Sequence, residues 1–243
     1  MAPAKDSPAG MSDFASPSPM SSGTVVNSDG YAHRRGVDTS RVQVARAATG
    51  RALITVTDDG ENSIIVVAGA NLELSGAQVA QSLDALTPRA ILIQREISDE
   101  ATLTTVDWAE RHGVRLIVNP SPPNFAELAW FALANPLIVN VHEARMFAGD
   151  DALSPEHVAR RLARTVRSVL VTLGDQGVWV AEGDEAHFVA PVPVARVEDT
   201  TGAGDEFAGA VAATLAHGGG LVDAAQAGAA AASRLVATAR AMR

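Results

Sequence analysis

The sequence predicts an α/β fold built on a largely parallel β-sheet. Apolar runs of strand length alternate with longer segments that carry apolar residues at helical spacing, and turn-forming residues separate the two kinds of segment. This alternation implies right-handed βαβ units. The polar motifs of the chain follow strand ends or open helices. Ligands of parallel sheets bind beyond the carboxyl ends of the strands, so we expect the functional site there.

The first regular elements are two β-rich segments, Ala52–Thr57 and Ser63–Val67. The turn residues Asp58-Asp59-Gly60-Glu61 between them predict a hairpin. Apolar residues at helical spacing predict helices over 74–86, 101–111, 125–133, 143–147, 155–165, 205–216 and 221–237. Short apolar or β-rich runs predict strands over 90–93, 114–118, 136–139 and 168–173, then a second hairpin formed by 177–181 and 186–189.

Length and composition indicate one sizeable globular domain, or one domain with a small appendage. The chain has 243 residues, of which 47% are hydrophobic, enough for a substantial core. Residues 1–24 are rich in Ser, Pro, Ala and Gly without periodicity, which predicts a disordered tail. The absence of Cys favours a reducing, cytoplasmic location. The net charge of -9 argues against a nucleic-acid partner, and no apolar run is long enough for a membrane span.

Lysine content excludes two classes of phosphate enzyme. The only lysine is Lys5, which lies in the predicted tail. A P-loop NTPase needs the lysine of its Gly-Lys-Ser/Thr motif, and a protein kinase needs a lysine on a strand. Any phosphate chemistry in this chain therefore has to use backbone amides, arginine or a metal ion.

The segment Asp199–Ala210 is the most informative part of the chain. Its Gly202-Ala203-Gly204 turn runs into a predicted helix, so backbone N–H groups and the positive end of the helix dipole can converge on an anion, most simply a phosphate. Asp205 follows at once and is placed to take a proton from a nucleophile. Taken alone, Gly-Ala-Gly-Asp is equally compatible with a turn whose Asp caps a helix.

Four more polar motifs follow predicted strands. They are Gln94-Arg95-Glu96, Asn119-Pro120, Asn140-Val141-His142-Glu143 and the segment Thr172–Gly177. Together with Gly-Ala-Gly-Asp, this order resembles the ribokinase, or PfkB-type, family of ATP-dependent carbohydrate kinases. Arg35–Ser40 is also similar to a ribokinase stretch, and the resemblance runs from about Ser28 to Ala232. It implies a three-layer α/β/α kinase domain over 25–243 with a partial β lid, the hairpin at about 49–68.

The resemblance implies a role for each motif. Asp205 corresponds to the general base that deprotonates the sugar hydroxyl, and Glu96 to a carboxylate that approaches the sugar. The residues of the implied anion hole are Gly202, Ala203 and Gly204. Asn140 and Glu143 match the element that arranges phosphates and Mg²⁺, the latter through water.

The nucleotide and potassium sites are implied in the same way. The turn that contacts the nucleotide corresponds to Thr172, Leu173, Gly174, Asp175, Gln176 and Gly177, with Gly204 at the phosphates. Asp199 and Thr201 match two contributors to an activating K⁺ site. Without the resemblance, Glu143 is equally well a solvated carboxylate at a helix start, and Thr172–Gly177 equally well a plain turn. Glu96 by itself is better interpreted as an ordinary loop carboxylate.

The implied activity is phosphorylation of a sugar hydroxyl by ATP, with Mg²⁺ and K⁺, and the similarity at Arg35–Ser40 favours ribose, giving ribose 5-phosphate. Two alternatives stay open. One is a relative that keeps only a nucleotide or phosphate site, and the other is a kinase for another sugar or a nucleoside.

The chain also departs from the family. It has neither the strand with a sugar-binding Asp nor the Gly-Gly-Lys-Gly-Ala-Asn loop of the family, and Ala237–Ala241 replaces a Thr-Arg-x-Gly-Ala stretch. We therefore expect a domain truncated on its N-terminal side and shortened on its C-terminal side. An uncovered sheet edge tends to pair with another chain, so we expect poor folding alone or self-association, with a homodimer as one form.

Overall fold

The structure is a computed structural model that describes residues 36–56 and 62–238. Of these, residues 45–56 and 62–238 belong to one compact unit and residues 36–44 to another. The described part of the smaller unit contains a turn in which Asp38 Oδ1 accepts from the Ser40 amide at 2.9 Å. The expected tail over 1–24 and the whole of the expected hairpin turn at 58–61 lie outside the described residues.

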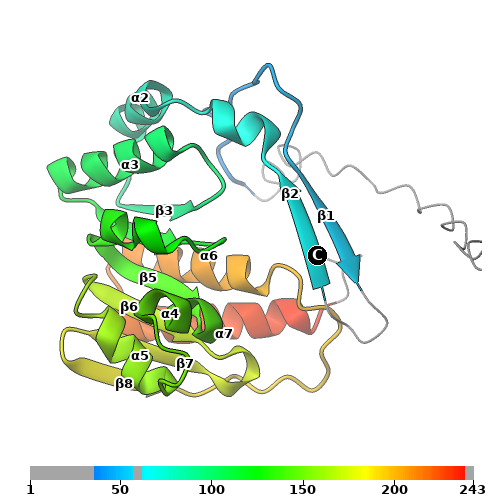
Figure 1. Cartoon of the computed structure of the whole chain (residues 1–243), viewed down its shortest axis with the longest axis vertical. Helices are drawn as coiled ribbons and strands as arrows, with labels where there is room; N and C mark the ends of the chain where they lie inside the picture. Colours follow the sequence, from blue (N-terminus) through cyan, green and yellow to red (C-terminus); the bar gives the residue numbers. More distant parts are fainter. Residues whose placement is uncertain (1–35, 57–61, 239–243) are drawn as a thin grey trace, which may run out of the picture. The chain divides into compact units, whose positions relative to one another are not determined.

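A six-stranded sheet with the order β3-β4-β5-β6-β7-β8 forms the centre of the larger unit (Figure 1). Strands β3 to β6 pair in parallel, and β7 and β8 add an antiparallel edge. The bounds are β3 Ala90–Gln94, β4 Arg115–Asn119, β5 Ala134–Asn140, β6 Ser168–Thr172, β7 Val178–Glu182 and β8 Glu185–Val189. The largely parallel sheet predicted from the alternating pattern is thus confirmed.

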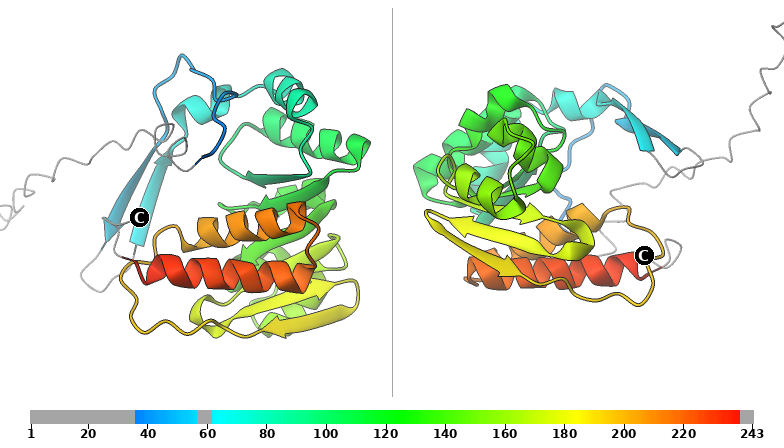
Figure 2. Two further views of the ribbon diagram at one scale, coloured as in Figure 1. Left: turned by 180° about the vertical axis from the view of Figure 1, so that it is seen from behind. Right: turned by 60° about the horizontal axis from the view of Figure 1, so that its bottom comes forward.

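Helices cover both faces of this sheet (Figure 2). Helices α6 (Ala203–Ala216) and α7 (Leu221–Val236) pack on one face, where Ile117, Ile138 and Leu170 form the core with them. The helices on the other side are α2 Gly76–Leu86, α3 Asp99–His112, α4 Val141–Ala148 and α5 Pro155–Leu162. Successive strand residues point to opposite faces, so Leu116, Val139 and Val171 belong to this second core. The three-layer α/β/α expectation is confirmed.

A separate two-stranded sheet precedes these layers. Strands β1 (Arg51–Val56) and β2 (Asn62–Val67) pair in antiparallel register from Arg51↔Val67 to Val56↔Asn62, as expected for the two strands of a hairpin. The short helix η1 (Gly69–Glu73) follows. The Glu73 carboxylate accepts from the amides of Arg46 and Ala47 at 2.8 and 2.9 Å, which ties the chain before β1 to the end of η1.

One predicted helix differs in type. The segment expected to be helical over 125–133 forms a 3₁₀ helix, η2 (Phe125–Phe131). Strand β5 starts at Ala134, two residues earlier than expected, because its first residues already pair with β4. The 3₁₀ helix ends at Phe131, and a turn at 132–133 leads into β5.

Close packing of α6 on α7 depends on Gly228. A Cβ at this position would lie 2.8 Å from the Phe207 ring and 3.0 Å from Val211, both on α6. We expect Gly228→Ala to lower the free energy of unfolding by about 1–3 kcal/mol through overpacking. A Cβ built on Gly209, also on α6, would have no atom within 4 Å. Gly209→Ala should therefore raise the free energy of unfolding by up to about 1 kcal/mol. Urea denaturation measures both, and equal stabilities would contradict this packing.

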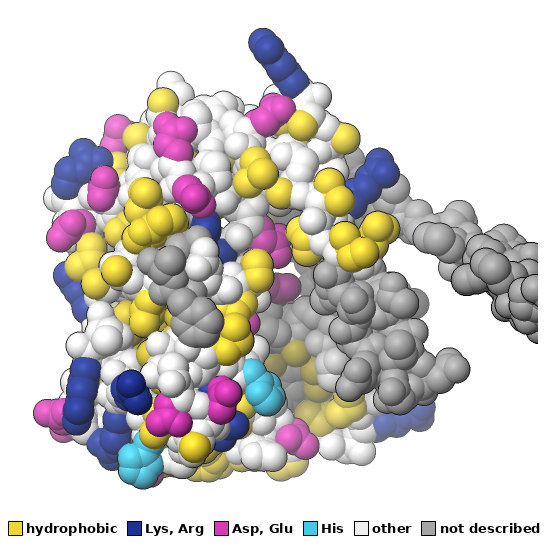
Figure 3. All heavy atoms as spheres, viewed as in Figure 1, with side chains coloured by type: hydrophobic (Ala, Val, Ile, Leu, Met, Phe, Trp, Pro, Cys, Tyr) yellow, Lys and Arg dark blue, Asp and Glu magenta, His cyan; other side chains and the backbone are white. Residues whose placement is uncertain are grey.

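The surface of the described residues carries both signs of charge. On the face drawn in Figure 3, Arg side chains are interspersed with Asp and Glu. Within the described ranges, no helix has the length and hydropathy that crossing a bilayer requires.

Candidate active site

Each parallel strand ends in a polar residue. The last residues of β3, β4, β5 and β6 are Gln94, Asn119, Asn140 and Thr172. Gln94 is in register with Asn119, and Asn140 with Thr172, so these side chains lie along one edge of the sheet. Asn119 is used within the sheet, since its Nδ2 donates to the Ile138 carbonyl at 2.9 Å. This is the edge at which the alternating pattern predicts the site, and the strand ends do gather there.

The Gly-Ala-Gly turn starts α6 as expected. Gly202 is the N-cap with φ of 81°, a left-handed conformation that glycine adopts without strain. The Ala203 amide donates to the Thr200 carbonyl at 3.1 Å, and the Glu206 amide donates to Gly202 at 2.9 Å. Among the described residues, the amides of Gly204 and Asp205 have no acceptor. The uncommitted donors of the first turn are therefore these two, whereas Ala203 is engaged within the turn.

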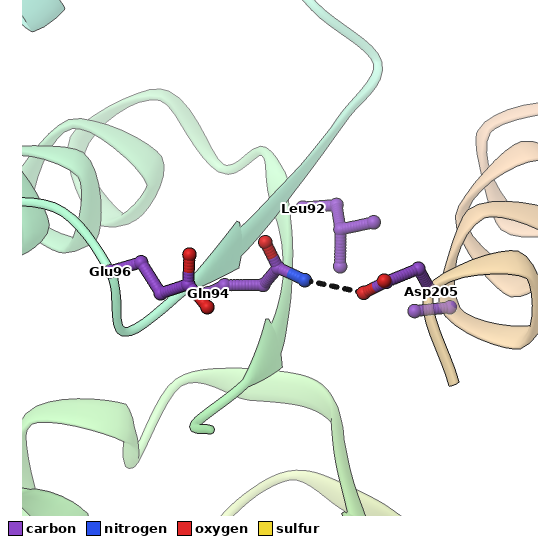
Figure 4. Close-up of a pocket in the computed structure, with 5 residues that line it drawn as sticks. Leu92, Gln94, Glu96 and Asp205 are labelled. Carbon is purple, nitrogen blue, oxygen red and sulfur yellow. Dashed lines mark hydrogen bonds between the residues drawn. The ribbon is translucent and has the colours of Figure 1, made fainter. Parts of the chain in front are cut away.

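Asp205 lies in a cavity of about 360 Å³ with Glu96. Gln94 Nε2 donates to Asp205 Oδ1 at 2.8 Å, a bond between the end of β3 and the first turn of α6 (Figure 4). Glu96 reaches the cavity from the loop after β3, and Leu92 and Ala208 form its apolar lining. No arginine is among the described residues that line the cavity.

The loop after β3 is fixed by Arg95. Its side chain is only 10% exposed, and its Nη2 lies 2.9 Å from Asp99 Oδ1. It also donates to Thr102 Oγ1 at 3.3 Å, and its guanidinium carbon lies 5.5 Å from the centroid of the Trp130 ring. These contacts attach the residue before Glu96 to the first turns of α3.

The Asn140–Glu143 motif forms a capping box at the start of α4. Glu143 Oε2 accepts from the Asn140 amide, and Asn140 Oδ1 accepts from the Glu143 amide, each at 2.9 Å. One oxygen of Glu143 is thereby committed to the helix, which leaves the other available to the solvent side. No cluster of three His, Asp or Glu side chains within the described residues could hold a metal ion directly.

The Thr172–Gly177 segment forms a tight turn between β6 and β7. Thr172 Oγ1 donates to the Val139 carbonyl at 3.4 Å, and the Leu173 amide donates to the Gly177 carbonyl at 2.9 Å. Between them, Gly174, Asp175 and Gln176 form the short, exposed helix η3.

The loop before α6 holds the last two expected site residues. Asp199 Oδ1 accepts from the Thr201 amide at 2.8 Å. The Val236 carbonyl at the end of α7 accepts from the amides of Glu198 and Asp199 at 2.8 and 3.4 Å. The loop is therefore attached to the last turn of α7.

The structure brings some expected residues together and leaves others apart. Asp205 and Glu96 share one cavity, and Asn140 lies beside Thr172 in the sheet. No hydrogen bond between described residues links these two groups. Gln94 has no role among the residues expected from the sequence, although a single polar residue at the end of the apolar run Ala90–Ile93 was a usable signal.

Comparison with known proteins gives consistent results. The family model described as pfkB family carbohydrate kinase matches residues 30–242. The chain is 34% identical over 183 residues to the ribokinase of Mus musculus. The aligned region covers 72% of this chain and 56% of that protein. The chain thus spans less than two thirds of the length of that curated relative.

Two solved structures extend the comparison. The Arabidopsis thaliana ribokinase complexed with ribose and ATP is 29% identical with a TM-score of 0.67, covering 79% of this chain and 64% of that one. The ribokinase from Cryptococcus neoformans var. grubii serotype A in complex with ADP is 28% identical with a TM-score of 0.74, covering 88% of this chain and 74% of that one.

Proposed function

Because the chain belongs to the pfkB family of carbohydrate kinases, we propose that it transfers the terminal phosphoryl group of ATP to a sugar hydroxyl. The acceptor we propose is ribose, and the product ribose 5-phosphate. The similarity to ribokinases, one of them solved with ribose and ATP, supports this choice.

The arrangement at the start of α6 carries the proposal. Asp205 lies in a cavity together with a second carboxylate, Glu96. The amides of Gly204 and of Asp205 itself have no acceptor among the described residues. In the proposed reaction Asp205 takes the proton of the attacking hydroxyl, and Glu96 binds another hydroxyl of the sugar. The amides of Gly204 and Asp205 receive the transferring group, where negative charge changes most in the transition state.

ATP fits the other groups along the sheet edge. The exposed turn Gly174–Gln176 would contact the nucleotide, beyond the carboxyl end of β6. The remaining oxygen of Glu143 suits a water-mediated contact to Mg²⁺, which supplies charge neutralisation at the phosphates when bound. We assign Asp199 and Thr201, on the loop that leads into α6, to K⁺.

Sugar-dependent release of ADP tests this proposal. We expect purified chain to release ADP from ATP with ribose, and much more slowly with 2-deoxyribose, fructose or adenosine. EDTA should abolish release and Mg²⁺ restore it, whereas replacing K⁺ by a larger organic cation should lower the rate. Tight ATP binding without ADP release for any sugar would overturn the kinase and favour a nucleotide-binding relative. A faster reaction with another acceptor would overturn ribose alone.

A further inference from the structure

The hydrogen bond between Gln94 and Asp205 joins two elements that are far apart in sequence. The residues are separated by 111 positions, and the bond spans from the last residue of β3 to the third residue of α6. Along β3, Ile91 and Ile93 are buried whereas Leu92 and Gln94 are exposed toward the cavity. Strand alternation therefore aims Gln94 at the face that α6 covers.

The chemistry of the pair fixes its direction. An ionised carboxylate can only accept hydrogen bonds, so the amide of Gln94 has to present its nitrogen to Asp205. This occupies Oδ1 of Asp205. Its Oδ2 has no hydrogen-bond partner among the described residues, and Figure 4 shows the carboxylate in the cavity beside Gln94. One oxygen is held, and the other is left to accept a proton.

The carboxylate at the same position of α4 makes a different kind of contact. Glu143 is the third residue of α4, and it bonds back to its own N-cap amide at 2.9 Å. Asp205 is the third residue of α6, and α6 has no side-chain cap at all. Its carboxylate is turned away from its own helix and toward a strand. A carboxylate used for helix stability would be expected to make the α4 type of contact.

We propose that Gln94 is a positioning residue that orients the Asp205 carboxylate for proton abstraction. The inference rests on the proposed kinase function and adds a residue to its site. Without the Gln94 donor, the Asp205 side chain can rotate and present either oxygen or neither to the sugar hydroxyl. The Asp205 carboxylate is then in the productive orientation for only part of the time, which lowers the rate of the chemical step.

Gln94→Met is the variant that tests this role, because it keeps the length of the side chain and removes the donor. We expect kcat to fall by about 10-fold to 100-fold, with the KM for ATP within about twofold of wild type. Gln226→Met, at an exposed glutamine on α7, is the control and should keep wild-type kcat. Both variants should unfold at the wild-type temperature.

A double mutant distinguishes positioning from a general structural effect. If Gln94 acts through Asp205, adding Gln94→Met to Asp205→Asn should not lower the residual turnover further. An equal loss in both backgrounds, or a wild-type kcat for Gln94→Met, would overturn the proposal.

A crystal structure of Gln94→Met gives a readout that does not depend on activity. We expect the Asp205 carboxylate in several orientations, against one in the wild type. A single unchanged orientation would refute the positioning role even in an active enzyme. Failure of the wild type to release ADP would instead refute the kinase function, and the crystal structures would still decide whether Gln94 orients Asp205.

Discussion

Replacing Asp205 by asparagine is expected to lower kcat for ribose-dependent ADP release by about 10²-fold to 10⁴-fold, the usual contribution of a general base. Asparagine has almost the same shape and can still lie beside Gln94, but it has no basic oxygen to take the hydroxyl proton. ATP binding, measured by calorimetry without sugar, should remain close to wild type, because the proposed nucleotide contacts lie on the β6–β7 turn.

Asp223→Asn is a matched control for this substitution. Asp223 is the third residue of α7, exposed like Asp205 and in a helix that also lacks a side-chain cap. The two variants therefore have the same change of charge at the same helical position. We expect wild-type kcat for Asp223→Asn. Retention of most activity in Asp205→Asn, or a comparable loss in both variants, would refute the assignment of the base.

Gly204→Ala is expected to reduce kcat/KM for ATP by about 100-fold, because the added methyl group keeps the phosphoryl group out of reach of a donor that the substitution itself leaves in place. Gly204 has a helical backbone conformation, and no atom lies within 4 Å of where its Cβ would be. The fold itself therefore does not require glycine here. Binding of a phosphoryl group by the amides of Gly204 and Asp205 does require glycine, because a methyl group beside these amides would obstruct the approach of the phosphoryl group.

Gly209→Ala separates this effect from helix stability. Gly209 is also exposed on α6 and also has open space around it. Alanine should stabilise both helical positions by up to about 1 kcal/mol, so the two variants should unfold at or above the wild-type temperature. Only Gly204→Ala should lose activity. Full activity in Gly204→Ala would show that no ligand approaches this turn closely.

Local patterns predicted most of the elements. Alternating apolar runs indicated the strands and helices, because each element has to bury one face and the spacing of its apolar residues reports that face. The boundaries shifted by a few residues where caps were decisive. Helix α3, for example, begins at Asp99 rather than at 101, since Ser98 accepts from the Ala101 amide at 3.1 Å. The helix predicted over 125–133 is a 3₁₀ helix that ends at Phe131, and a turn at 132–133 leads from it into β5.

The candidate site was predicted in its parts. Asp205 and the glycine turn were singled out by a local pattern, because small residues before a helix are typical of an anion site. Glu96 was singled out only by the resemblance to the family. The commitment of the Ala203 amide to Thr200 could not be read in the same way, because it depends on the backbone angles of the turn. The bond between Glu143 and Asn140 had a usable signal, since Asn followed three residues later by Glu is the pattern of a capping box.

By itself, the sequence determined the α/β class, the order of the elements and the family, because periodicity and short motifs are local properties of the chain. Only the tertiary structure decided that Gln94 bonds to Asp205 and that Glu96 shares their cavity. Those contacts depend on how α6 packs over β3, and packing is set by many distant side chains at once.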